Sequence, residues 1–330
     1  MAAKVSSGNA AANPAGPVFP EGRRYNRCAM THNDSPLFRA LDGLYGPSAI
    51  PQLAAGRFLV LEDEKTHPFS LLTIGSDGAV TGSPVRQKPQ DLPKLNDLEG
   101  IALNQSGHIY AITSHSRDSD GEEKASRERL LRFRIEADRV VAPKVSNALK
   151  PALLAAHPVL AAAAEIRDVK AGGGLNIEAL DLSPDAQRLL IGFRSPLLGK
   201  RALVACVENP AAIFDSGEAP RISARLETLD LGGNGIRGMS WFPCLDGYLV
   251  IGGPVAREPV QFQLWFWSGL RGAPPRRVTV PGLQGFEHAE GISPAIIDGR
   301  QHIILVSDDG NREEGRCARY LLLDPGQLQI

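Results

Sequence analysis

The chain has 330 residues, of which 43% are hydrophobic and 22% are charged, and its formal net charge is −1 with a pI near 6.7. This composition is typical of a globular protein with a substantial core and excludes general disorder. Because the chain carries no excess of basic residues, nucleic acid and anionic membrane surfaces are not expected as partners. The sequence also contains no run of about 18 apolar residues that would predict a transmembrane helix.

The amino-terminal residues 1–36 are expected to form a flexible segment, and residues 37–330 the folded domain. The start of this segment is rich in Ala, Gly, Asn and Pro and lacks the apolar centre of a secretion signal, which favours a cytoplasmic protein. If a leader has been removed, the protein would be periplasmic. The cysteines form no closely spaced pair and are expected as buried thiols, with disulfides open only after export: Cys28, Cys206, Cys244 and Cys317.

One pattern recurs along the chain: a short strand with a charged or otherwise special residue, a turn, and a strongly apolar strand that ends in polar residues. A weak first copy covers residues 48–64, and the clearest copy covers residues 97–117. Three further copies cover residues 176–194, 235–253 and 288–310. Five copies at intervals of about 50 to 80 residues predict an all-β fold, a single β-propeller with five blades, with six blades as the alternative.

Each unit also contains a candidate third strand: residues 70–74, 130–135, 203–207, 262–267 and 320–323. The last unit ends early, so a segment near residues 37–41 is expected to supply its fourth strand and close the ring. The longest interval contains residues 147–166, which are rich in Ala and Leu but are interrupted by Pro151 and Pro158. This composition predicts two short inserted helices, which either pack on the side of the propeller or cover the channel mouth.

The innermost strands of a propeller surround its axis, so residues at matching places in the repeats should form a ring. The aligned residues are Ser48, Glu99, Glu178, Arg237 and Glu290. Side chains two positions apart share a strand face, which adds Asp97, Asn176 and His288 to the predicted ring. Clustered carboxylates disfavour one another's ionised form unless a metal or an arginine compensates them. Oxygen ligands would suit Ca²⁺, with Mg²⁺ or Mn²⁺ as alternatives.

Two arrangements of these charges remain open. In one, Arg237, Arg117 and Arg194 neutralise the glutamates of the ring and join the blades through ion pairs. In the other, His115, Arg117 and Arg194, which lie at corresponding strand ends, bind a phosphate or carboxylate through bidentate hydrogen bonds.

Residues 97–100, 113–117, 191–196 and 307–310 resemble a bacterial propeller family of unknown function, and the likeness spans roughly residues 40–325. The looser relatives are similar to phytase-like esterase domains and to calcium-dependent lactonases of the gluconolactonase and regucalcin type. Those families place a divalent metal in the channel, so the resemblance implies a metal near Glu99-Gly100, Glu290-Gly291 and Asp308. Ser48 and Arg237 depart from that pattern.

The first functional hypothesis is therefore a metal-dependent hydrolase that acts on an ester, lactone or phosphoester with an anionic substrate. Its expected metal ligands are Asp97, Glu99, Glu178, Glu290 and Asp308. Proton transfer would fall to His115 or His288, and substrate binding to Arg117, Arg194 and Arg237. The alternative is a non-catalytic propeller that binds a small molecule or a protein, in which the channel charges form a structural salt-bridge network. The oligomeric state is left open.

Overall fold

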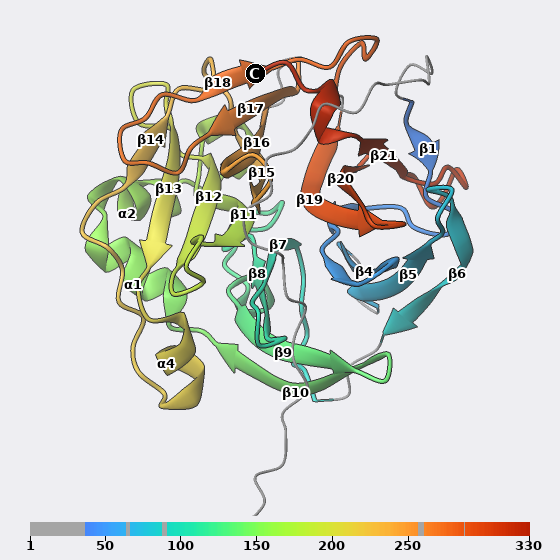
Figure 1. Ribbon diagram of the computed structural model, residues 1–330. Coiled ribbons are helices and arrows are strands. Elements are labelled where there is room, and N and C mark those ends of the chain that lie inside the picture. The colour runs from blue at the N-terminus through green and yellow to red at the C-terminus, as the bar shows by residue number, and fades with distance from the viewer. Residues whose placement is uncertain (1–36, 64–66, 88–90, 257–260, 287) are drawn as a thin grey trace, which may run out of the picture.

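The protein is a five-bladed β-propeller: five antiparallel sheets are arranged in a ring around a central axis (Figure 1). A computed structural model describes residues 37–330 except 64–66, 88–90, 257–260 and 287. The expected flexible segment 1–36 therefore lies outside the described residues. Five blades were predicted and six were the alternative, so the structure confirms the preferred blade number.

Each blade has four strands in sequence order from the axis outward, except where the ring closes. Blade 1 comprises β2 (Pro47–Ala49), β4 (Arg57–Glu62), β5 (Phe69–Ile74) and β6 (Val80–Gln87), with β3 (Gln52–Ala54) paired to β4. Blade 2 comprises β7 (Leu98–Leu103), β8 (Ile109–Thr113), β9 (Leu130–Glu136) and β10 (Arg139–Ser146). Blade 3 comprises β11 (Asn176–Leu182), β12 (Leu189–Ser195), β13 (Ala202–Val207) and β14 (Glu227–Leu229). Blade 4 comprises β15 (Gly235–Phe242), β16 (Gly247–Gly253), β17 (Gln263–Trp267) and β18 (Arg276–Val278).

Blade 5 closes the ring with strands from both ends of the chain. It contains β19 (Ala289–Ile297), β20 (Arg300–Ser307) and β21 (Arg319–Leu323), and its outermost strand is β1 (Arg39–Ala40). Arg39 pairs with Tyr320 and Ala40 with Arg319, which confirms the predicted closure near residues 37–41. Closure covers the edge of β21, which would otherwise expose unpaired backbone groups.

The hydrophobic core consists of five clusters, and each cluster fills the interface between two neighbouring blades. In β4, Phe58 and Val60 belong to the cluster shared with blade 5, whereas Leu59 and Leu61 belong to the cluster shared with blade 2. Alternate side chains of a strand point to opposite faces, and here both faces are buried. This double burial explains why the central residues of the second strand of each repeat are apolar.

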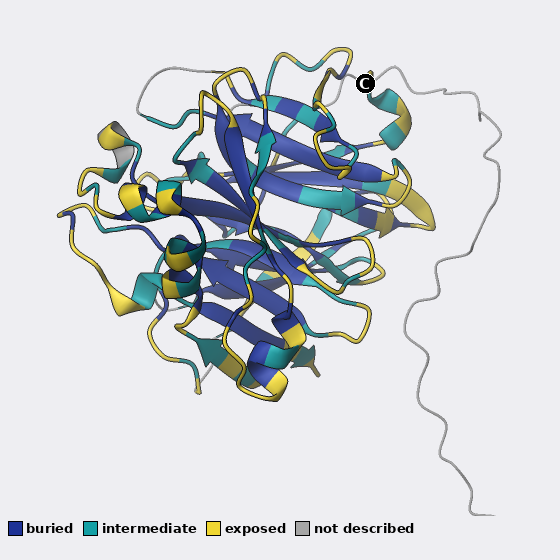
Figure 2. Cartoon of the chain, turned by 90° about the vertical axis from the view of Figure 1, so that its left-hand side faces the viewer, coloured by how far each residue is buried: buried dark blue, intermediate teal, exposed yellow. Residues whose placement is uncertain are grey.

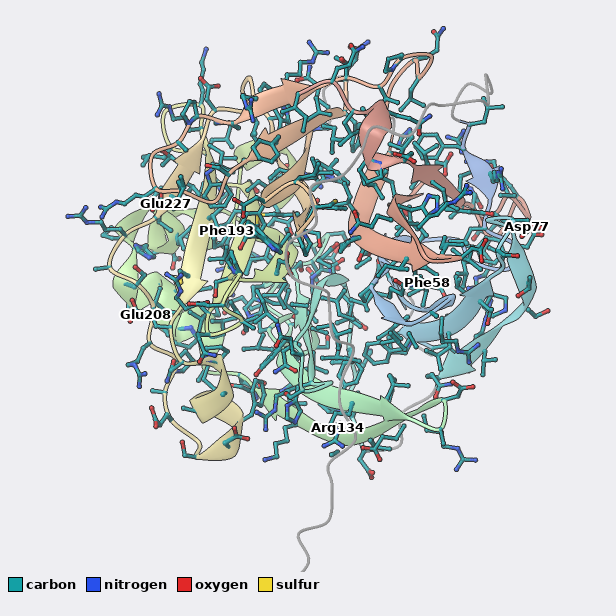
Figure 3. The ribbon with its side chains drawn as sticks, viewed as in Figure 1. Phe58, Asp77, Arg134, Phe193, Glu208 and Glu227 are labelled. Carbon is teal, nitrogen blue, oxygen red and sulfur yellow. The ribbon has the colours of Figure 1, made fainter. Side chains whose placement is uncertain are left out.

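The figures show the same division between core and rim. Buried residues fill the stacked strands, and exposed ones concentrate in the turns (Figure 2). Phe58 and Phe193 lie among the blades, whereas Asp77, Arg134 and Glu208 lie at the periphery (Figure 3).

The helical insertion was predicted correctly, and it lies on the side of the ring. It contains α1 (Leu149–Ala156) and α2 (Pro158–Ala164), followed by the single turn α3 (Val169–Gly172). Apolar residues of α1 and α2 join the cluster between blades 2 and 3, away from the axis (Figure 1). A further short helix, α4 (Pro210–Asp215), follows β13, and 3₁₀ turns occur at Ala125–Arg127 and Pro325–Gln327.

Two smaller expectations concern membrane-spanning helices and the cysteines. No helix in the described part of the chain is both long and apolar enough to span a bilayer. The three described cysteines are free thiols, but Cys244 is exposed and Cys206 and Cys317 are only partly buried. The expectation of buried thiols is therefore wrong for Cys244 and met only in part by Cys206 and Cys317, and Cys28 falls outside the described residues.

Candidate functional site

All five predicted ring positions lie on the innermost strands, and each one is a β-bulge. The register of the inner strand slips at Ser48 in β2, Glu99 in β7, Glu178 in β11, Arg237 in β15 and Glu290 in β19. At a bulge two residues oppose one on the partner strand, so the extra residue leaves the ladder and its side chain is re-aimed. Five equivalent bulges therefore direct these side chains to the channel.

The small residue that follows each ring position is required by the close approach of neighbouring inner strands. A Cβ atom on Gly238 would lie 1.9 Å from the carbonyl oxygen of Glu290 in the next blade. A Cβ atom on Gly291 would lie 2.8 Å from the Cα of Ala49. The Glu-Gly pairs noticed in the sequence thus have a packing cause, in addition to any role of the glutamates.

Arg237 joins three blades through ion pairs. Its Nε lies 2.9 Å from Oε2 of Glu178, its Nη1 donates to Oε1 of Glu178 at 3.2 Å, and its Nη2 pairs with Glu290. Glu178 and Glu290 are buried, with 5% and 7% of their surface exposed. Arg194 and Asn176 complete the network, since Arg194 Nη1 (3.1 Å) and Asn176 Nδ2 (2.9 Å) both donate to Oε1 of Glu178.

Two other predicted site residues, Asp97 and Arg117, have partners that are not ring residues. Asp97 precedes β7 with a φ of 62°, so the alternation rule does not apply to it, and its carboxylate pairs with Arg127. Arg117 uses its Nε and Nη1 to bind the carbonyl oxygens of Ala164 and Gly121, which are part of the helical insertion and its neighbouring loop. Among the described residues its ion-pair partner is Glu123, at 3.6 Å, and not one of the ring glutamates that the first arrangement assigned to it.

The two predicted proton-transfer histidines lie in different surroundings. His115 is buried, its Nδ1 is 2.8 Å from the carbonyl oxygen of Thr113, and its Nε2 has no hydrogen-bond partner among the described residues. Burial lowers the pKa of His115 to about 4, which favours the neutral ring. His288 is exposed and its ring lies 5.8 Å from that of Phe262. The structure does not bring the two histidines together.

A cavity of about 670 Å³ occupies the centre of the ring. It extends from the ring residues Ser48, Glu99 and Glu290 to the turns that follow the inner strands, and its size is that of a site for a drug-sized molecule. Its walls come mainly from apolar side chains of the inner strands, among them Ile101, Leu103, Leu180, Met239 and Ile292.

Glu99 is the ring carboxylate that stays unpaired and lines this cavity. It is partly exposed, and it makes no hydrogen bond or ion pair with any described residue. Its enclosure by protein raises its pKa well above the ordinary value, and the charges of Asp97, Glu178 and Asp63 raise it further against the opposing effect of Arg237. Enclosure likewise raises the pKa of Asp308 to about 6, although this side chain at the channel mouth keeps contact with solvent.

Two acidic residues near the channel were missed by the sequence reasoning. Asp63 accepts a hydrogen bond from the backbone of Asp97 at 3.0 Å, and it adds to the negative potential at Glu99 and Asp308. Its position at the end of an apolar strand, like that of Asp308, was an available signal. Asp181 lines the cavity and accepts backbone hydrogen bonds from Leu182 and Trp241, and burial raises its pKa to about 7. An acidic residue between two leucines was its only mark in the sequence.

The five carboxylates predicted as metal ligands do not form one set. Arg127 pairs with Asp97, and Arg237 pairs with both Glu178 and Glu290, while Glu99 and Asp308 have no ion-pair partner among the described residues. Among the described residues, no three His, Cys, Asp or Glu side chains are grouped closely enough to bind a metal ion. The donor set therefore does not fit the metal site that the resemblance implied.

Several solved structures are similar to the chain at low sequence identity. A putative oxidoreductase (glucose dehydrogenase) from Thermus thermophilus is 16% identical with a TM-score of 0.44, and the match covers 87% of this chain and 100% of that one. The Malassezia sympodialis allergen Mala s 1 is 13% identical with a TM-score of 0.44 and coverages of 90% and 84%. Kuenenia stuttgartiensis hydrazine synthase is 10% identical with a TM-score of 0.37, and the match covers 80% of this chain but only 56% of that one.

None of the curated proteins matches the chain. The model of one sequence family, described as proteins of unknown function (DUF3616), matches residues 71–321. This range covers most of the propeller, including four of the five ring positions. The chain therefore belongs to the DUF3616 family.

Proposed function

We propose that this protein is a small-molecule-binding propeller whose ligand occupies the central cavity. The observation that carries the proposal is the cavity itself, which has about 670 Å³ of space, apolar walls and an unpaired carboxylate at one end. Ligand sites in proteins have this character: they are concave, mostly apolar and contain a few polar groups that orient the ligand.

In this proposal the network of Glu178, Arg237 and Glu290 has a structural role. Arg237 forms ion pairs with two buried carboxylates from its neighbouring blades, and Arg194 pairs with one of them, so the two arginines balance the two carboxylates without a ligand. An arginine held in this way has few donors left for an anionic substrate. Arg194 is similarly engaged, since its Nε donates to the carbonyl oxygen of Pro254 at 3.0 Å and its Nη1 to Glu178.

A neutral apolar probe tests the cavity independently of charge. Phenylbutanol should bind the wild-type protein in ligand-observed NMR or calorimetry. Leu103→Trp should weaken this binding about tenfold or more, because Leu103 lines the cavity and the larger ring reduces its volume. Leu270→Trp is the matched control, since Leu270 is 70% exposed and lies outside the cavity. Equal binding by both variants, or no binding by the wild type, would refute the proposal.

The metal-dependent hydrolase with an anionic substrate stays a prediction with less support. Glu99 and Asp308 are the two predicted ligands that have no ion-pair partner in the described part of the chain, and an ion bridging them would also face Arg237. Metal analysis of protein purified without chelator, combined with thermal stability after addition of Ca²⁺ or Mn²⁺, tests it. A bound metal that is lost in Glu99→Gln would favour this hypothesis over the binding propeller.

A further inference from the structure

We infer that the ligand of the central cavity is an organic cation, an apolar molecule with an ammonium group that pairs with Glu99. This inference rests on the proposed binding function and names the chemical class of the ligand. It follows from the charges of the cavity wall, the free position of Glu99 and the apolar character of the surface around it.

Several charged groups of the cavity wall already have an ion-pair partner or are neutral. The wall carries the carboxylates of Glu99, Asp138, Asp181 and Glu290 and the basic side chains of Arg57 and His302. Arg57 pairs with Asp138 at 2.7 Å, and Arg237, behind the wall, pairs with Glu290. Burial lowers the pKa of His302, which favours its neutral form. No cation of the described wall is therefore free to receive an anionic ligand.

The two remaining carboxylates differ in what they still need. Asp181 is satisfied by the backbone N–H groups of Leu182 and Trp241. Glu99 accepts no hydrogen bond from any described residue, and its neighbours Asp97, Asp63 and Glu178 add negative potential, which Arg237 opposes. The ionised form of a carboxylate enclosed in this way is stabilised by a ligand that supplies both a positive charge and N–H donors.

The surroundings favour an organic cation over a metal ion. A hard divalent cation requires six or more oxygen ligands or retained waters. Beside Glu99 the wall instead presents Gly100, Ile101 and the apolar inner strands. An ammonium group on an apolar body would fill both parts of the site, the charge at Glu99 and the body against the walls.

Three probes of the same shape separate the charge from the cavity: phenylbutylammonium, phenylbutanol and phenylbutanoate. The ammonium should bind the wild type about 10- to 100-fold more tightly than the alcohol, because the free energy of a hydrogen bond to a charged partner corresponds to a change in affinity of this size. The carboxylate should bind most weakly. Glu99→Gln should remove the advantage of the ammonium and leave the affinity for the alcohol within about threefold.

The pH dependence gives a second readout. In the wild type the affinity for the ammonium should rise as the pH increases through the raised pKa of Glu99, because only the ionised carboxylate forms the pair, and Glu99→Gln should abolish this rise. The groups that face Glu99 are Asp63, Asp97, Glu178 and Arg237, and all are retained in the variant.

The outcomes distinguish the two claims. If the alcohol binds as tightly as the ammonium, or if Glu99→Gln keeps the preference, the cation inference is overturned and the binding cavity stands. If none of the three probes binds, the proposed function and the inference both fall. If Leu103→Trp weakens all three probes while Glu99→Gln weakens only the ammonium, both are supported.

Discussion

Arg237 should be the most costly single charge to remove from this protein, and Arg237→Met tests that expectation. The substitution removes the ion pairs to Glu178 and Glu290 but keeps an unbranched side chain. Glu178 retains Arg194 at 3.1 Å, whereas Glu290 loses the one ion-pair partner it has among the described residues. Breaking a buried pair by removing one partner typically costs about 3–5 kcal/mol, and we expect a loss in this range in the free energy of unfolding.

Denaturant unfolding near pH 7 measures this loss, with Arg188→Met as the matched control. Arg188 has half of its side chain exposed and lies 3.9 Å from Asp185, so its removal should change stability by less than about 0.5 kcal/mol. The second substitution Glu290→Gln in the Arg237→Met background should recover part of the loss, because it removes the unpaired buried charge.

The pH dependence of Arg237→Met has a definite sign. Without Arg237, burial should raise the folded-state pKa of Glu290 above its unfolded value. The folded variant then binds this proton more tightly than the unfolded chain does. The contribution of Glu290 to the stability of the variant is therefore greatest at low pH and is lost as the pH rises through the raised pKa. The difference in the free energy of unfolding between wild type and variant should therefore become smaller as the pH falls from about 7 to about 5. A loss no larger than that of Arg188→Met, or a gap that widens on acidification, would contradict the structural role of the network.

Three further predictions concern the cavity wall, the close approach of the blades and the ring closure. Asp181 has a pKa raised to about 7, so its contribution to stability should fall as the pH rises from about 4 to about 7. The expected fall is roughly 1–3 kcal/mol after allowance for the partial exposure of the side chain. Asp181→Asn should flatten this part of the plot of unfolding free energy against pH. Gly238→Ala should lower the melting temperature far more than Gly299→Ala, because the new Cβ meets the Glu290 carbonyl oxygen in the first case and open space in the second. A similar loss from both substitutions would show that backbone strain in the turn, and not the close approach of the strands, sets the loss of stability. Leu41→Ala should cost about 2–5 kcal/mol in denaturant unfolding because Leu41 is fully buried between blades 5 and 1, whereas Leu270→Ala at an exposed position should have little effect; comparable values would refute the importance of this amino-terminal anchor.

The repeat that was visible in the sequence determined the propeller, its five blades and the ring positions. Residues in a strand alternate between its faces, and this local rule operates in the same way in every blade. The apolar second strands are a consequence of that rule, and the structure also contains the Glu-Gly pairs and the closure near residues 37–41 that the repeat pattern indicated.

Which glutamate each arginine reaches was decided only by the tertiary structure. The sequence placed Glu99 and Glu178 at equivalent positions, yet Arg237 and Arg194 both bind Glu178, and Glu99 has no ion pair with a described residue. Arg117 bonds to the helical insertion, although its place at a strand end resembles that of Arg194. A strand pattern gives the face on which a side chain starts, but the partner that a long arginine reaches depends on bulges and on neighbouring blades distant in sequence. That is why the ring was predictable from the sequence and its pairing was not.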